Sequence, residues 1–180
     1  GEGEIVDAPF SPSPFPPFSA PEGPERATRH APRVKVYPAI ALGMLRREQV
    51  AAGRVWLLLR HLDGAGRGWL ELDAARAALC DRASPLRLCG RRRLRQLLAE
   101  GEDLFWQREI RTGAPDRLWL RGPARVAAAL GVPRLVGRPV GIPVAALRGG
   151  IGDARAHLYA TFHSGRAREG LDFGAGEQRS

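Results

Sequence analysis

The stretch SPLRLCGRRRLRQLLAEG, residues 84–101, combines five arginines with five leucines, and the fold assignment depends on it. Ser84 followed by Pro85 predicts the start of a helix, because serine can accept hydrogen bonds from first-turn amides and proline is tolerated in the first turn. Gly101 comes directly after the last helix-forming residue and predicts where the helix ends. The stretch is therefore predicted to form one amphipathic helix with many positive charges.

Helical periodicity divides this predicted helix into a leucine side and an arginine side. The side expected to face the core holds Leu86, Gly90, Leu94, Leu97 and Leu98. The opposite side holds Leu88, Arg92, Arg95 and Gln96, with Arg91 on its flank and Arg87 at its beginning. Arg93 is expected nearer the core, where it either extends along apolar surface or pairs with Glu100 or Asp103. Because the segment RLCGRRRLR contains no acidic residue, contact with a polyanion is favoured over a merely solvated face.

The elements before this helix follow from apolar spacing and from turn residues. Residues 48–62 repeat apolar positions at helical spacing until the segment DGAGRG interrupts them. The short stretch at 68–72 predicts a strand, and Asp73 is expected to cap a second helix that ends near Asp81. Only the segment DRA would then separate this helix from Ser84.

Two apolar stretches after the arginine-rich helix predict a β-hairpin. Residues 104–110 and 117–120 are rich in aromatic and aliphatic residues, and the loop RTGAPD between them contains glycine, proline and aspartate. The side chains expected to point inward are Phe105, Leu118 and Leu120. Trp106 and Trp119 are expected to share the other face as a diagonal pair across the strands.

The predicted order of elements resembles the winged helix-turn-helix superfamily over residues 48–121. The resemblance implies an α+β fold, mainly α with a small antiparallel β-hairpin, followed by a C-terminal extension helix. It also implies that the third helix enters the DNA major groove and that the hairpin loop, the wing, touches the backbone or the minor groove. The residues that match these DNA-binding positions are Arg87, Arg91, Arg92, Arg95, Arg108, Arg111 and Arg117. Guanidinium groups suit this role because they bind phosphate or guanine with two hydrogen bonds at once.

The chain is expected to divide into four parts. Residues 1–33 are proline-rich and predict a disordered leader, whose phenylalanines are the alternative signal for a partner-binding motif. Residues 34–131 are expected to form the winged-helix domain, including a short helix at 122–131. Residues 132–166 predict an extended connector and a helix, which loosely resembles part of the replication initiators of plasmids and phages and would open a second winged-helix unit. Residues 167–180 predict a disordered tail.

The charge balance narrows the class of partner. The 180 residues carry 28 basic and 19 acidic side chains, a net charge of +9, and Lys35 is the only lysine. Such an excess favours nucleic acid first and an anionic membrane surface second. No apolar run approaches the roughly 20 residues that span a bilayer, and no secretion signal is recognised, so a cytoplasmic protein without a membrane partner is expected. Cys80 and Cys89 are too few for a disulfide scaffold or a zinc site.

These observations predict double-stranded DNA binding in replication initiation or transcription regulation, with a mobile element as the expected source. Two alternatives stay open: a protein-interaction module using Trp106, Trp119 and Leu88, and RNA binding through the same basic surface. No enzyme, catalytic residue, metal, cofactor or small-molecule ligand is indicated, because His157, His163 and Ser164 lack an acid or a second base to orient them. Both a monomer and a homodimer are compatible with the pattern.

Overall fold

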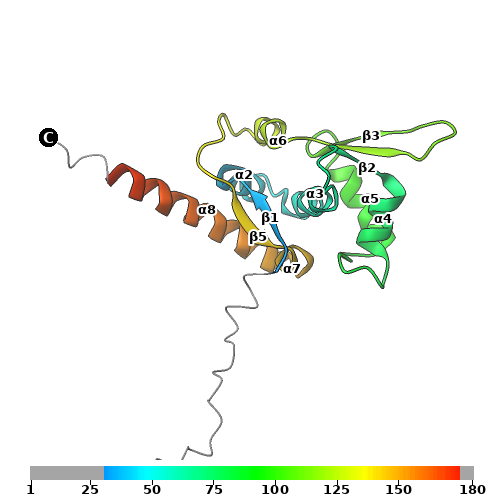
Figure 1. Cartoon of the computed structure of the whole chain (residues 1–180), viewed down its shortest axis with the longest axis horizontal. Helices are drawn as coiled ribbons and strands as arrows, with labels where there is room; N and C mark the ends of the chain where they lie inside the picture. The colour runs from blue at the N-terminus through cyan, green and yellow to red at the C-terminus, as the bar shows by residue number, and fades with distance from the viewer. Residues whose placement is uncertain (1–30, 175–180) are drawn as a thin grey trace, which may run out of the picture. The chain divides into compact units, whose positions relative to one another are not determined.

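A computed structural model describes residues 31–174 of the chain, with side chains as far as residue 164. The fold is α+β, with helices arranged around two small antiparallel sheets (Figure 1). The helices are α2 (Pro38–Arg46), α3 (Val50–Leu62), α4 (Leu72–Cys80), α5 (Arg91–Glu100), α6 (Pro123–Ala129), α7 (Val144–Arg148) and α8 (Ile151–Gly174). The strands are β1 (Arg33–Val36), β2 (Trp69–Glu71), β3 (Trp106–Glu109), β4 (Arg117–Leu120) and β5 (Val140–Pro143).

Helix α5 begins at Arg91, and the predicted start at Ser84 is wrong. The Ser84 hydroxyl donates to the carbonyl of Ala78 and accepts from the amide of Leu86, so Ser84 holds the chain against the end of α4 and does not cap a helix. Gly90, expected inside the helix, is its N-cap residue. Glycine has a low helix propensity, and its position between Cys89 and Arg91 is consistent with the late start.

The connection between α4 and α5 therefore spans residues 81–90, which is much longer than the expected DRA turn. Leu86 and Leu88 lie two positions apart, and both are half-buried against the core. Leu86 lies in a turn that begins at Ser84, whose carbonyl accepts from the amide of Arg87 at 3.2 Å. Leu88, expected on the outward face, is therefore part of the packed layer.

The second sheet has the strand order β2-β4-β3, and all of its pairs are antiparallel. The β3–β4 hairpin is confirmed, as are the buried positions of Phe105 and Leu118. The expected Trp106–Trp119 pair is wrong. Trp106 is paired with Leu120 and is fully buried, whereas Trp119 is paired with Trp69 of β2 and is 42% exposed.

Phe105 and Trp106 are consecutive and can both be buried because the strand begins only at Trp106. Phe105 precedes the strand, and its amide donates to the carbonyl of Gly101, so the strict alternation of strand side chains does not include it. The Trp106 indole N–H donates to the carbonyl of Leu98 at 3.0 Å. Its ring lies where a side chain on Gly101 would be, so the glycine at the end of α5 makes room for the tryptophan.

Several other expected elements are present with shifted limits. Strand β2 and helix α6 lie close to the predicted ranges, and α3 begins at Val50. Asp73 lies inside the first turn of α4, where it pairs with Arg76, and it does not cap the helix. Helix α2 is not among the expected elements, although Pro38 at its first turn and apolar residues at helical spacing are typical of a helix start.

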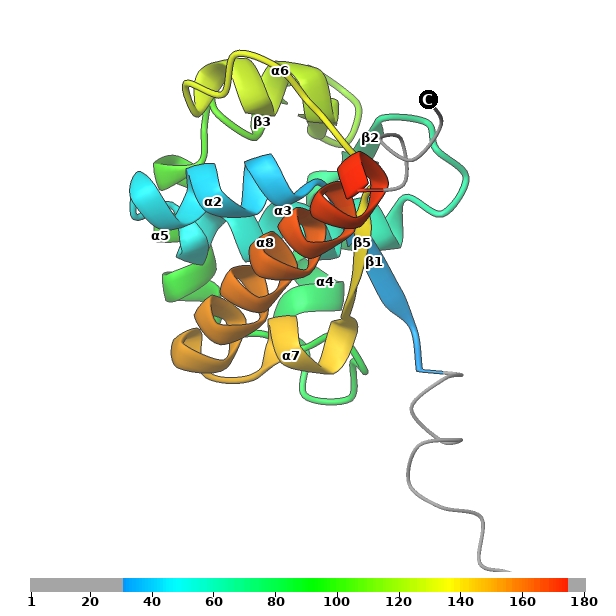
Figure 2. The same ribbon diagram turned by 90° about the vertical axis from the view of Figure 1, so that its left-hand side faces the viewer.

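Two segments far apart in the sequence meet in the first sheet, which consists of β1 and β5 in antiparallel pairing. Residues 132–139 are extended or irregular as expected, whereas β5 and α7 occupy the rest of the predicted connector. Helix α8 packs along α2 (Figure 2), with Ala154 and Leu158 fully buried and Ile151, expected on the same side, 43% exposed. The ranges 34–131 and 132–166 therefore contribute to one core.

Trp56 of α3 lies near the centre of this core and is fully buried. Its ring centroid is 5.7 Å from that of Phe105, and its indole N–H donates to the carbonyl of Arg121 at 3.0 Å. The same helix buries Val55, Leu57, Leu58 and Leu59.

Residues 1–30, which make up most of the expected leader at 1–33, lie outside the described residues. In the expected tail at 167–180, α8 continues to Gly174, and residues 175–180 lie outside the described residues.

Candidate nucleic-acid interface

Helix α5 is held by leucines on one side and exposes arginines on the other. Leu94, Leu97 and Leu98 are buried, and the helix packs against α3 and α4. Arg92 and Arg95 project away from this apolar side and are exposed, so the two predicted faces are confirmed from Arg91 onward. The apolar side fixes the helix, and the arginine side is open to a partner.

The exposed arginines differ in whether the protein neutralises them. Among the described residues, none forms an ion pair or a side-chain hydrogen bond with the guanidinium groups of Arg87, Arg91, Arg92 and Arg95. Arg93 behaves differently, because its guanidinium lies 3.3 Å from both Gln96 and Glu100. The predicted alternative in which Arg93 pairs with Glu100 is confirmed.

The position of these charges along α5 is electrostatically unfavourable for the protein alone. Arg91, Arg92 and Arg93 occupy the first turn, which contains no acidic residue. The amide dipoles give that end of a helix a partial positive charge, so cations there reduce stability and anions increase it. No side chain caps the helix, and the space around Gly90 is open. Free amides and guanidinium groups at one open helix end favour a phosphate ligand.

A hollow of about 320 Å³ brings part of this surface together with α4. It is lined by Arg76, Arg91 and Arg95 and by the edges of Leu94 and Leu98. The sequence did not indicate Arg76, because its role depends on how α4 packs against α5. Its guanidinium lies 3.0 Å from the exposed carboxylate of Asp73, so Arg76 is less available than Arg91 or Arg95.

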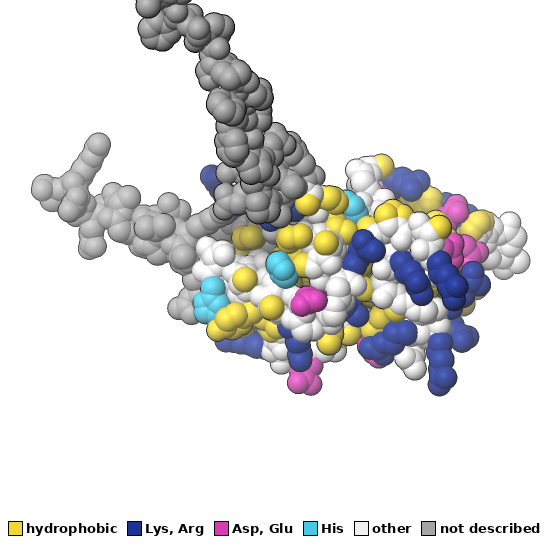
Figure 3. All heavy atoms as spheres, turned by 90° about the horizontal axis from the view of Figure 1, so that it is seen from below, with side chains coloured by type: hydrophobic (Ala, Val, Ile, Leu, Met, Phe, Trp, Pro, Cys, Tyr) yellow, Lys and Arg dark blue, Asp and Glu magenta, His cyan; other side chains and the backbone are white. Residues whose placement is uncertain are grey.

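Seen from below, Lys and Arg side chains gather at the end of the molecule where α4 and α5 lie (Figure 3). The predicted wing arginines are on the β3–β4 hairpin, which reaches outward at the same end (Figure 1). The structure thus brings Arg91 and Arg95 together around one hollow, whereas the wing residues belong to a separate element.

Two of the three predicted wing arginines use their guanidinium groups within the protein. Arg108 forms an ion pair of 3.2 Å with Glu102, which also accepts from the Arg108 amide at 2.7 Å. The Arg117 guanidinium lies 3.9 Å from the centroid of the Trp69 ring, a cation–π contact. Arg111 is half-buried, and its amide donates to the carboxylate of Asp116 at 3.0 Å. Of the seven predicted residues, Arg108 and Arg117 are therefore the least available for phosphate.

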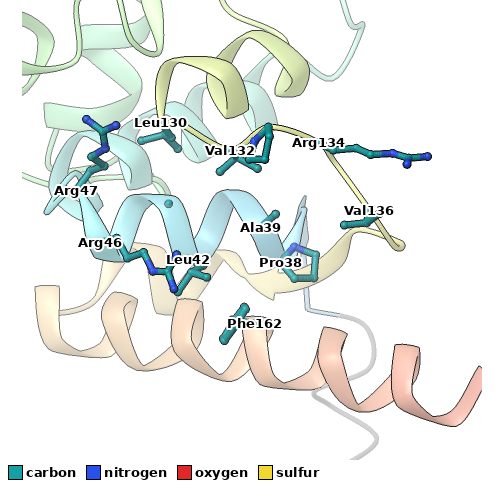
Figure 4. A pocket seen from close by; sticks show the side chains of 13 residues that line it. Pro38, Ala39, Leu42, Arg46, Arg47, Leu130, Val132, Arg134, Val136 and Phe162 are labelled. Atoms are coloured by element: carbon teal, nitrogen blue, oxygen red, sulfur yellow. The ribbon is translucent and has the colours of Figure 1, made fainter. Parts of the chain in front are cut away.

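A second hollow, of about 460 Å³, lies at a different place, between α2, the segment after α6, and α8 (Figure 4). Its walls are mainly apolar and include Leu42, Val132 and Phe162. Arg47 and Arg134 are at its edge, and in Figure 4 their side chains point away from it. The hollow has room for a small apolar group but does not gather its positive charges on one ligand position.

Replacing Arg91 with glutamate is expected to stabilise the free protein. The change removes a cation from the first turn of α5 and supplies an anion beside Arg92 and Arg95, for a gain of about 0.3 to 1 kcal/mol. Urea unfolding measures this free energy, and Arg91→Gln, which removes the charge without reversing it, is expected to gain less. If the Arg91→Glu variant were less stable than the parent, the positive charge of Arg91 would have to form a stabilising contact that the structure does not contain.

Other chemistry receives less support from the described residues. In the described range, no group of three or more His, Cys, Asp and Glu side chains is arranged to hold a metal ion. His157 and His163 are both exposed on α8, and the His163 ring packs edge-on against Tyr159 with centroids 4.3 Å apart. None of the described helices combines the length and apolar character needed to cross a bilayer.

Comparisons of the chain with protein-family models, curated protein sequences and solved structures found no match.

Proposed function

We propose that the chain is a double-stranded DNA-binding protein of the winged-helix type, in which α5 enters the major groove. The observation that carries the proposal is the group of arginines at the start of α5 that have no partner within the described protein. A fold bears such uncompensated charge at a cost in stability, and an anionic partner removes that cost. Arginine side chains and helix N-termini are common sources of phosphate contacts on DNA.

The order of elements supports the winged-helix assignment. Helices α3, α4 and α5 precede the β3–β4 hairpin, and β2 joins that hairpin to make a three-stranded sheet. In this assignment α5 is the recognition helix and the hairpin is the wing. The connection at 81–90 departs from the tight turn that the resemblance implies, and it places Arg87 on a loop beside the helix.

The contacts within the protein suggest different roles for the arginines of the helix and those of the wing. Arg91, Arg92 and Arg95 are free to meet phosphate oxygens or the acceptor atoms of guanine. Arg108 and Arg117 are committed to Glu102 and Trp69, so we assign them to shaping the hairpin. Arg111 is the wing arginine proposed to touch the DNA backbone.

The biological role proposed is replication initiation or transcription regulation, in the cytoplasm and for a mobile element. The basis for this part is the resemblance to winged-helix proteins and the net charge of +9. Whether one copy or a homodimer binds is decided by the number of half-sites in the bound duplex, because a two-fold symmetric protein selects a two-fold symmetric sequence.

A salt series on one duplex tests the proposal. Each neutralised phosphate releases counterions and contributes a slope of about −0.9 to the plot of log affinity against log salt. Phosphate contacts by Arg91, Arg92 and Arg95 on α5 and by Arg111 on the wing therefore predict a slope of about −3 to −4. A slope near zero would exclude phosphate contact. Competition with duplex and single-stranded RNA is the second arm, and preference for RNA would support the RNA-binding alternative.

The protein-interaction alternative keeps one specific observation in its favour. Ile110 is 84% exposed and Trp119 is 42% exposed, and both belong to the hairpin region. Trp106, which that alternative also needs, is buried in the core, and Leu88 is half-buried. A protein partner lost on Trp119→Ala but retained when the α5 arginines are replaced would favour this function over DNA binding.

A further inference from the structure

Cys80 and Cys89 lie on either side of the connection that leads from α4 to α5. Cys80 is the last residue of α4, and Cys89 precedes the N-cap residue of α5. The carbonyl of Leu79 accepts from the amides of Leu88 at 2.8 Å and Cys89 at 3.3 Å, which draws the two backbones together. Each thiol influences the pKa of the other, and both are reduced and half-buried.

This placement meets the main requirement for a disulfide within one chain. A disulfide needs two cysteines whose backbones are already close and whose side chains point toward one another. The backbone hydrogen bonds from Leu88 and Cys89 to Leu79 meet the first condition, and the influence of each thiol on the pKa of the other indicates that the two side chains are close together. The connection that the bond would close contains Arg82 and Arg87, and Arg91 begins α5 directly after it.

We propose that Cys80 and Cys89 are a reversible oxidation site that forms an intramolecular disulfide on reaction with a peroxide. One thiolate attacks the peroxide O–O bond, takes one oxygen as a sulfenic acid and releases water after protonation of the leaving oxygen. The second thiol then attacks the sulfenic sulfur, the S–O bond breaks and a second water leaves. Two thiols and one hydrogen peroxide thus give one disulfide and two waters, and a dithiol reductant reverses the bond by exchange.

The surroundings of the thiols determine how readily they react. Burial raises the pKa of both thiols above the ordinary value, so at neutral pH they are mainly protonated. Nearby guanidinium groups act in the opposite direction, Arg91 and Arg87 on Cys80 and Arg54 and Arg93 on Cys89. The site is therefore expected to respond to excess oxidant and not to act as a highly activated cysteine.

The test treats the full chain with hydrogen peroxide and follows its intact mass, free thiols and mobility without reductant. The expected product is a monomer that has lost two hydrogen atoms and both free thiols, contains a cross-linked peptide with both cysteines, and returns to the starting mass with dithiothreitol. Gain of oxygen atoms without cross-linking, formation only of disulfide-linked dimers, or retention of both thiols would each overturn the proposal.

Cys80→Ser and Cys89→Ser are the matched controls. Each keeps one thiol, which is expected to gain oxygen or to link two chains and not to form the internal bond. An internal mass loss of two hydrogens that persists in either variant would contradict the assignment to this pair. These readouts use no DNA, so failure of the disulfide and failure of the proposed function are distinguishable, and the result on the parent protein does not depend on how well a variant folds.

Discussion

Replacing Arg91, Arg92 and Arg95 together with alanine is expected to lower the affinity for duplex DNA roughly a hundredfold, if each contact contributes about 1 kcal/mol. The three guanidinium groups are exposed and have no ion-pair partner among the described residues. Their loss removes the proposed contacts with DNA but no ion pair or side-chain hydrogen bond among the described residues. Alanine is the best helix former, so the melting temperature should stay the same or rise. Fluorescence anisotropy with a labelled duplex measures the affinity.

A charge-matched control separates contact from long-range attraction. Arg125, Arg134 and Arg138 are also exposed, lie on or after α6, and carry the same total charge. Replacing them with alanine is expected to weaken binding by about threefold or less at physiological salt, because distant charges are screened. Equal losses in the two triple variants would mean that α5 is not the recognition element.

The largest loss of stability is expected for Trp56→Ala. The side chain is fully buried, packs against Phe105 and satisfies the carbonyl of Arg121. Its removal leaves a cavity and an unpaired, half-buried carbonyl, which together cost about 3 to 5 kcal/mol. Urea unfolding of parent and variant measures this difference. The total free energy of unfolding of a domain of this size is roughly 5 to 15 kcal/mol. The variant is therefore expected to be partly unfolded at physiological temperature.

Trp119→Ala is the control for this experiment. Trp119 has the same chemistry but is 42% exposed, and its indole donates to the carboxylate of Glu109 on the outer face of the hairpin. Its replacement is expected to cost about 1 kcal/mol or less. If the two variants were equally stable, the core would not be centred on α3 as the structure has it.

Local patterns were sufficient to predict the elements from α3 to β4. The leucines of α5, the turn residues between β3 and β4, and the alternation in β4 each depend on neighbours only a few residues away. The start of α5 could not be predicted in this way. Ser84 can cap a helix or bond to the preceding one, and the choice depends on the carbonyl of Ala78 at the end of α4.

The candidate site likewise has some features that local sequence patterns predict and others that depend on tertiary contacts. The two faces of α5 were predictable because Leu94, Leu97 and Leu98 fix the outward direction of the arginines. The engagement of Arg108 with Glu102 and of Arg117 with Trp69 was not predictable, because both contacts depend on strand register and turn geometry. The proximity of Cys80 and Cys89 likewise depends on the path of residues 81–90.

Pairing of β1 with β5 also has a consequence for synthesis on the ribosome. Strand β1 leaves the ribosome well before β5, which is its only partner among the described strands and ends at Pro143. Until that point has emerged, Val34 and Val36 belong to an open strand edge, and α2 lacks the helix α8 that covers it. Contacts this distant in sequence form late, and apolar surface exposed meanwhile favours aggregation. The nascent chain is therefore expected to close its core only after β5 and α8 have emerged, and until then chaperones have apolar surface to bind.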